Sequence, residues 1–225
     1  VILEEIQRRN DRPDELSAEA LQALMFPGNA LGWAILGKTE VIKSLSRADF
    51  LRYHQSQYKS DNLVVVLAGE KREWDLKWFK DLPKGEAGGF EKVLGVTGPA
   101  VKVVRKDLAN QAHLELGVPG VNVADPRRFA LTLLTSYLGQ GLSSRLFMEL
   151  REKRGLCYAV HASEARFRDT GEWDVYAGVN IDKLEGAIEG ILDELRRTKE
   201  IKLTKDELAQ TKEKVRGPVL YSMED

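Results

Sequence analysis

Two side chains that could act on a peptide carbonyl, Arg151 and Tyr158, stand seven residues apart. A guanidinium and a phenol can each donate a hydrogen bond to a carbonyl oxygen, or to the oxyanion that forms when the carbonyl is attacked. A third candidate group is the carboxylate pair Glu4 and Glu5, because carboxylate oxygens can ligate zinc. Each group also has an ordinary interpretation: a helix-capping arginine, a half-buried strand tyrosine, and solvated acidic residues on a helix.

The elements around Arg151 and Tyr158 should hold the two side chains near each other. Their stretch, residues 138–160, reads LGQGLSSRLFMELREKRGLCYAV, with two serines that can cap a helix start. Leucines at positions 142, 146 and 150 recur every four residues and predict one face of a short helix. Gly155 should end that helix, and an alternating strand should begin at Tyr158. The pattern therefore predicts Arg151 late on a helix and Tyr158 at the start of the next strand, joined by a tight turn.

Helical and strand patterns alternate along the rest of the chain. Residues 1–10 indicate the tail of an amphipathic helix, and Pro13 fits the first turn of a second one. Four later helices start at capping signals: Ser46 to about Tyr58, Asp125 to Gly139, Asp182 to Leu195, and Thr204 onward, the last kinked or broken at Gly217-Pro218. A further helix candidate covers 72–79, and the expected strands are 63–68 (buried), 112–118, 158–162 and 172–179, the last two joined by a hairpin turn at 169–171.

This order of elements indicates an α+β protein, with helices stacked on one face of a largely antiparallel sheet. The best candidate for a linker is residues 83–89, which read PKGEAGG. Glycine, proline and charged residues leave little there to bury, so we expect a domain boundary at this point.

Composition narrows the class of protein. The chain has 225 residues, of which 43% are hydrophobic and 31% charged, as expected for one or two globular domains. Its net charge of −1 provides no global attraction for nucleic acid or an anionic membrane. The longest apolar run, 63–68, is far shorter than the ~18 residues needed to span a bilayer. The single cysteine, Cys157, excludes an internal disulfide and is expected to be a small apolar filler.

The stretch GQGLSSRLFMELREKRGLCYAV resembles a sequence of the pitrilysin/insulinase (M16) family of zinc metallopeptidases, in its processing-peptidase-like branch. That family has two homologous halves, and the resemblance implies that Arg151 and Tyr158 belong to the second half and reach substrate held at the zinc of the first. The opening VILEEIQRRNDRPDE resembles the segment that ends in the family's third zinc ligand, which implies that Glu5 is the ligand. Glu4 faces about 100° away around a helix and cannot readily bind the same ion.

The resemblance also implies the domain organisation. Residues 1–82 correspond to the C-terminal part of the zinc-bearing first half, 83–99 to a linker, and 100–225 to a second, substrate-binding half that is truncated at its C-terminus. The run FPGNALGWAILG resembles F-P-x-H-P-L-G-x-x-I-L-G of the family and supports the assignment of the first part.

One departure from the family concerns catalysis. The family's chemistry needs an H-x-x-E-H helix, whose histidines bind zinc and whose glutamate is the general base for the attacking water. This chain contains only three histidines, His54, His113 and His161, in no such arrangement. We interpret all three as surface or hydrogen-bonded residues. The chain is therefore expected to be a fragment that neither binds catalytic zinc nor cleaves peptides by itself, with the general base upstream.

The leading hypothesis is a fragment of a zinc metalloendopeptidase whose substrates, peptides or unfolded proteins, are enclosed between two halves and bound partly by strand addition to a sheet edge. The alternative is a non-catalytic binding or scaffold subunit of the same fold. Either could form a homodimer or a heterodimer with a homologous subunit. We expect no nucleic-acid partner and no membrane insertion, and a soluble protein of the bacterial cytoplasm or periplasm rather than of an organelle.

Overall fold

A computed structural model describes residues 1–70, 76–79, 82–85, 89–93, 98–106 and 111–221. The chain forms two compact units, one from residues 1–6 and 36–92 and the other from 7–35 and 93–225. The change of unit between Lys92 and Val93 lies inside the expected linker, whereas 7–35 pack with the second unit. The correspondence of these units to two homologous halves stays a prediction.

The first unit contains helices and extended chain. It holds the start of α1 (Ile2–Asn10), then α3 (Thr39–Ser44), α4 (Arg47–Gln57) and the 3₁₀ turns η2 (Ser60–Asn62) and η3 (Leu76–Phe79). The capping signal before α4 is confirmed, because the Asp49 carboxylate accepts from the Ser46 backbone N–H at 2.8 Å and from its hydroxyl at 2.6 Å. These bonds satisfy a backbone donor that a helix start leaves unpaired.

The buried strand predicted at 63–68 is wrong. These residues are irregular, and Val64 and Val66 are 86% and 82% exposed. A β-branched run becomes a strand only when neighbouring backbone satisfies its N–H and C=O groups, and the described part of the chain supplies no such partner here. Of the helix candidate at 72–79, residues 76–79 form η3, and the remainder lies outside the described residues.

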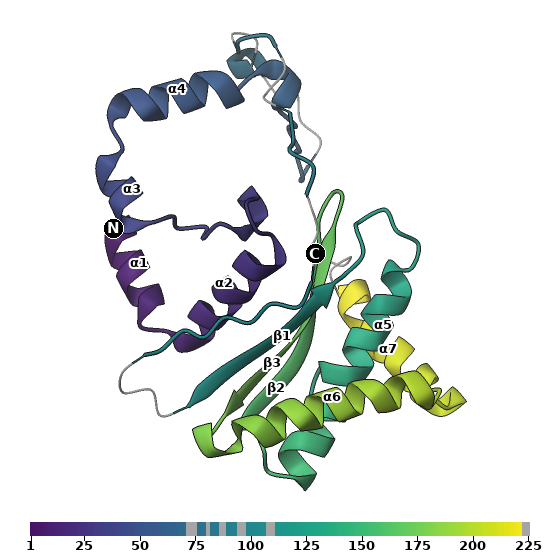
Figure 1. Ribbon diagram of the computed structural model, residues 1–225. Coiled ribbons are helices and arrows are strands. Elements are labelled where there is room, and N and C mark those ends of the chain that lie inside the picture. Colours follow the sequence, from purple (N-terminus) through teal and green to yellow (C-terminus); the bar gives the residue numbers. More distant parts are fainter. Residues whose placement is uncertain (71–75, 80–81, 86–88, 94–97, 107–110, 222–225) are drawn as a thin grey trace. The chain divides into compact units, whose positions relative to one another are not determined.

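The second unit is built around a three-stranded antiparallel sheet. Its strands are β1 (Ala112–Pro119), β2 (Ala159–Arg166) and β3 (Gly171–Val179), in the order β1-β3-β2. The predicted hairpin between β2 and β3 is confirmed, and the Phe167 N–H donates to the Thr170 carbonyl at 2.9 Å in its turn. Together with the helices, the sheet confirms the α+β class (Figure 1).

Helices cover both faces of this sheet (Figure 1). On one face lie α5 (Arg128–Gly139), α6 (Leu184–Glu200), which follows the 3₁₀ turn η5 (Ile181–Lys183), and α7 (Lys205–Tyr221). On the other, α2 (Pro13–Met25), followed by η1 (Ala30–Gly32), packs against β1. The approach is close because Gly117 has no side chain; a Cβ there would lie 2.6 Å from Leu21 Cδ1. The sequence predicted helices on one face of the sheet only. The structure differs, because α2 covers the other face.

The core lies between the sheet and α5–α6. The predicted inward face of β3 is confirmed, because Val175, Ala177 and Val179 are completely buried. Burial of such apolar side chains is the main favourable contribution to folding. The other buried members of this core are Leu138, Leu146, Leu150, Cys157, Val160, Ala162, Trp173, Ala187 and Ile191.

The last helix differs from its predicted course. α7 begins at the predicted capping signal, where the Glu207 carboxylate accepts from the Thr204 backbone N–H at 2.8 Å. It then continues as helix to Tyr221 with Pro218 inside it, so of the kink or break expected at Gly217-Pro218 the break does not occur. None of the helices in the described part of the chain has the length and apolar composition needed to cross a membrane.

Candidate functional site

Arg151 lies on a short π-helix, η4 (Phe147–Lys153), in the second unit. The predicted leucine face is correct for Leu146 and Leu150, which are completely buried, and wrong for Leu142, which is 73% exposed in the preceding turn. Because Leu150 anchors the helix, the next side chain points outward, and that of Arg151 is 44% exposed. Its guanidinium carbon lies 4.8 Å from the centroid of the Phe147 ring, within the range of a cation–π contact.

The turn after η4 is held by backbone hydrogen bonds. Gly155 has φ +57°, a conformation that glycine adopts without strain, as the sequence predicts for a helix end. Its N–H donates to the Arg151 carbonyl at 3.1 Å, and the Leu156 N–H donates to the Leu150 carbonyl at 2.8 Å. The Lys183 ammonium also donates to the Gly155 carbonyl, at 2.8 Å. The chain between the two candidate residues therefore has a defined path.

Tyr158 stands where that turn enters the sheet. Its backbone N–H donates to the Gly178 carbonyl at 2.8 Å, just before the first paired residue of β2. Tyr158 is 53% exposed, and its hydroxyl donates to Asn180 Oδ1 at 3.0 Å. The structure thus presents both Arg151 and Tyr158 at the surface of one unit, at the two ends of one turn.

Cys157 lies between the two and behaves as the predicted filler. It is 6% exposed and belongs to the core. Burial raises the pKa of the Cys157 thiol, and the positive charge of Arg151 opposes that shift. The thiol is therefore protonated at neutral pH, a form that is a poor nucleophile.

Glu5 lies in the other unit, in the first turn of α1. It is exposed, as is Glu4, and both backbone N–H groups bond to the Val1 carbonyl. The described residues contain no group of three histidine, cysteine, aspartate or glutamate side chains that could hold a metal ion. Since catalytic zinc takes three protein ligands, Glu5 cannot complete a zinc site within the described chain.

A polar cluster that the sequence did not predict lies on the α2 side of the sheet. His113 Nδ1 lies 2.8 Å from the Tyr176 hydroxyl, and the His161 ring is 4.8 Å from the Tyr176 ring between centroids. Burial, then the charges of Asp174 and Glu172, raise the pKa of Glu115 to about 8. The only signal in the sequence was the polar alternation of three separate strands, whose register becomes known only with the strand order.

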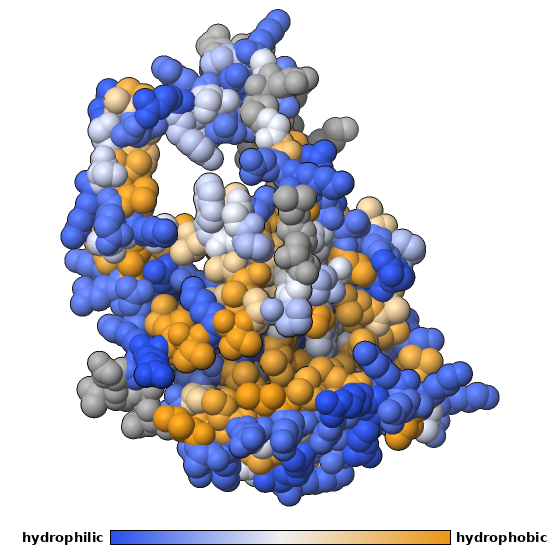
Figure 2. Space-filling model, in the orientation of Figure 1, coloured by the Kyte–Doolittle hydropathy of each residue, from blue (hydrophilic) through white to orange (hydrophobic). Residues whose placement is uncertain are grey.

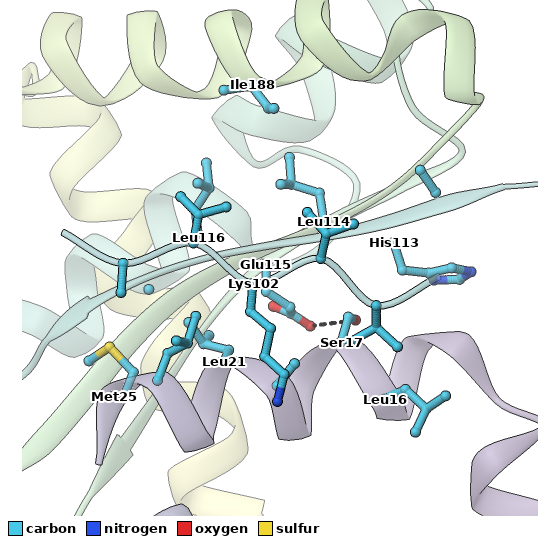
Figure 3. Close-up of a pocket in the computed structure, with 18 of the residues that line it drawn as sticks. Leu16, Ser17, Leu21, Met25, Lys102, His113, Leu114, Glu115, Leu116 and Ile188 are labelled. Carbon is cyan, nitrogen blue, oxygen red and sulfur yellow. Dashed lines mark hydrogen bonds between the residues drawn. The ribbon is translucent and has the colours of Figure 1, made fainter. Parts of the chain in front are cut away.

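A cavity of about 870 Å³ adjoins this cluster at the edge of β1. Figure 3 shows Leu114 and Leu116 pointing toward Ile188 of α6, and Glu115 pointing the opposite way, toward Ser17 of α2. The segment 98–106 forms a further wall. Figure 2 shows apolar side chains gathered beside β1 and over α6 on the face in view.

Comparison with known proteins gives one family and a consistent set of relatives. A family profile described as "Peptidase M16 inactive domain" matches residues 44–215. The chain is 33% identical over 229 residues to the uncharacterized zinc protease YmxG of Bacillus subtilis, and 32% identical over 238 residues to an uncharacterized zinc protease of Streptomyces coelicolor. These alignments cover 100% of this chain but only 55% and 51% of the relatives. The chain thus spans about half the length of the curated relatives it matches.

Solved structures share the fold. A protease from Helicobacter pylori matches with a TM-score of 0.86 at 21% identity, over 100% of this chain and 57% of the other. A peptidase M16 inactive domain from Pseudomonas fluorescens matches with a TM-score of 0.82 at 23% identity, over 97% of this chain and 54% of the other. At such identities the likeness shows the fold alone, and it agrees with the α+β architecture described above.

Proposed function

Because the chain belongs to the peptidase M16 family, as the match over residues 44–215 shows, we propose that it is part of a zinc-dependent metalloendopeptidase. Its curated relatives bear the name zinc protease, which supports this assignment. In the proposed arrangement, residues 1–82 end the zinc-bearing half, 83–99 form the linker, and 100–225 belong to the substrate-binding half. The substrate would be a peptide or an unfolded protein enclosed between the halves.

The observation that carries the proposal is the exposure of Arg151 and Tyr158 at the ends of one fixed turn. A guanidinium offers five N–H donors and a phenol one O–H donor. Directed at one peptide, these groups would bind backbone carbonyls and stabilise negative charge that develops on the attacked oxygen. Because the turn is held by the carbonyls of Leu150 and Arg151, the backbone that carries the two donors needs little reorganisation when substrate arrives.

Zinc would be held partly outside this chain. Glu5 is exposed in the first turn of α1, so its carboxylate is accessible to an ion, but the described residues supply no complete ligand set. We propose Glu5 as one ligand, with the remaining ligands and the general base contributed by residues beyond this chain. For the chain itself the proposed role is therefore to bind and polarise the substrate.

The test is metal analysis and peptide cleavage by the whole protein from its natural gene. The wild type should contain zinc and cleave unfolded peptides. Arg151→Ala and Tyr158→Phe should each lower kcat/KM by about 100-fold, in line with the loss of one oxyanion donor, and leave the zinc content unchanged. Glu5→Gln should lower the zinc content. A whole protein that holds zinc and cleaves peptides equally well with and without Arg151 and Tyr158 contradicts the proposed roles.

The second candidate function is a non-catalytic binding or scaffold subunit. The description of the matched profile as an inactive domain favours it. In this case the whole protein would contain no zinc and would support peptide cleavage only after a homologous partner subunit is added. Metal analysis of the purified whole protein therefore separates the two functions.

A further inference from the structure

Asn180 is the hydrogen-bond partner of the phenol at position 158. The Tyr158 hydroxyl donates to Asn180 Oδ1 at 3.0 Å. The partners meet because the Tyr158 backbone N–H donates to the Gly178 carbonyl, which places the tyrosine beside the end of β3, and Asn180 follows two residues later. The contact is thus a consequence of β2–β3 pairing, between residues far apart in the sequence.

The Asn180 side chain does not cap the 3₁₀ turn that follows it. Asn180 is the N-cap residue of η5, a position where an asparagine side chain commonly accepts a hydrogen bond from a backbone N–H of the following turn. Its side chain makes no such capping bond within the described chain, and the Lys183 N–H instead donates to its backbone carbonyl at 2.9 Å. The side-chain amide of Asn180 is therefore available for a hydrogen bond with the Tyr158 hydroxyl.

The chemistry of the pair limits what Tyr158 can do. A phenol has one proton to donate, and in this structure it is donated to Asn180 rather than left for a substrate. A carboxamide carries an acceptor oxygen and a donor NH₂ group on one plane, and a half turn about its last side-chain bond exchanges them. After that turn, the Asn180 NH₂ group would donate to the phenolic oxygen and leave the phenolic proton available.

We propose that Asn180 is a positioning residue for Tyr158, which accepts the phenolic proton in the empty protein and donates to the phenolic oxygen when substrate is bound. This inference rests on the proposed function for its kinetic consequence, because Tyr158 is taken to bind the substrate carbonyl. After the exchange, the hydrogen bond that the Asn180 NH₂ group donates keeps the phenol in place. It also polarises the phenol, since hydrogen bonds in a chain strengthen one another.

The kinetic test uses the whole protein with two substitutions at this position. Asn180→Asp keeps the size of the side chain but offers acceptors only, so it should retain the phenolic proton and lower kcat/KM by about tenfold or more. Asn180→Ala removes both functions and should lower it by about fivefold, the equivalent of one ordinary hydrogen bond. In a Tyr158→Phe background, Asn180→Asp should have no further effect, because the two residues act together.

The matched control is Asn122→Ala. Asn122 also accepts a hydrogen bond through its side chain, from the Ala124 N–H at 3.0 Å, but its loop contacts the opposite end of the β2–β3 hairpin at Phe167. It should leave kcat/KM unchanged. The proposal is overturned if Asn180→Ala is at least as damaging as Asn180→Asp, if both stay within twofold of wild type, or if Asn180→Asp remains fully damaging without the Tyr158 hydroxyl.

A second readout needs no activity. With 3-fluorotyrosine incorporated, the ¹⁹F resonance of Tyr158, assigned by Tyr158→Phe, should shift in Asn180→Ala and Asn180→Asp and stay in place in Asn122→Ala. If the whole wild-type protein cleaves no peptide, the proposed function fails while this resonance still tests the contact. If the resonance does not respond to Asn180, the inference fails even in an active enzyme.

Discussion

Arg145 Nε donates to Glu194 Oε2 at 2.5 Å, joining the helical residues directly before η4 to α6. Glu194 is 3% exposed, and its other oxygen accepts from Arg197 at 3.1 Å. Arg145 also donates to the Tyr137 hydroxyl of α5, which in turn donates to Glu207 of α7, each at 3.1 Å. This network links α5, α6 and α7 to the residues directly before η4, the helix on which Arg151 lies.

Replacing Glu194 by alanine should destabilise the second unit strongly. The substitution leaves the Arg145 guanidinium, whose side chain is only 20% exposed, without its carboxylate partner. Loss of one member of a buried ion pair typically costs about 3–5 kcal/mol. Urea unfolding followed by circular dichroism measures the change.

The neighbouring Asp193 provides the control for that experiment. Asp193 pairs with Arg196 at 2.7 Å on the solvent side of α6, with side chains 55% and 68% exposed. Asp193→Ala should cost no more than about 1 kcal/mol, as exposed pairs usually do. Equal losses for the two substitutions would contradict the assignment of Glu194 to a buried network. The double variant Arg145→Met/Glu194→Leu should recover much of the stability, because both charges are then removed.

Gly139→Ala should prevent normal packing of α5 on β2. A Cβ at this position would lie 2.1 Å from the Ala162 backbone nitrogen and 2.5 Å from its Cβ, so that the helix and strand would have to separate. We expect a loss of about 3 kcal/mol, at the upper end for overpacking. Gly186→Ala in α6 is the matched control, since its Cβ would meet only Leu156 Cδ2, at 3.5 Å. Thermal melts should show a lower Tm for the first variant and an unchanged or higher one for the second.

The contribution of Glu115 to the stability of the second unit should fall as pH rises above about 4.5. The pKa of Glu115 is raised from 4.5 to about 8, chiefly by burial between α2 and the sheet. The folded state therefore binds this proton more tightly than the unfolded state. The stabilisation is complete below pH 4.5 and is lost as pH rises to about 8 and beyond.

Glu115→Gln should flatten that pH dependence, because the amide resembles the protonated carboxyl and does not titrate. Urea unfolding between pH 4 and pH 9 should show a smaller decrease in the free energy of unfolding than in the wild type. Glu189→Gln, at an exposed position of α6, serves as the control and should reproduce the wild-type slope. A Glu115→Gln profile parallel to that of the wild type would show that the Glu115 carboxyl is ionised in the folded state throughout.

Arg151→Lys should separate charge from geometry in the proposed peptidase. Lysine keeps the positive charge but not the planar fork of donors or the stacking on Phe147. In the whole protein, kcat/KM should fall nearly as far as in Arg151→Ala. Full retention of activity would mean that only the positive charge at position 151 is required.

Local sequence signals predicted the elements whose stabilising contacts are near in the chain. The capping residues Ser46 and Thr204 start α4 and α7, and Gly155 ends η4, because each bonds or bends within a few residues of itself. The inward face of β3 was predictable too, since alternation along a strand assigns side chains to faces. The run 63–68 was mispredicted because its composition favours a strand but cannot supply the neighbouring strand.

The sequence by itself therefore determined the starts of α4 and α7, the end of η4, the β2–β3 hairpin, the inward face of β3 and the placement of Arg151 and Tyr158 at the ends of one turn. The tertiary structure alone decided the strand order β1-β3-β2, the position of α2 on the second face of the sheet, and the contact between Tyr158 and Asn180. The physical reason is the distance along the chain over which each feature is stabilised. Hydrogen bonds and steric limits within a turn act between near neighbours, whereas sheet order, buried pairs and the protonation of Glu115 depend on residues that meet only after the chain has folded.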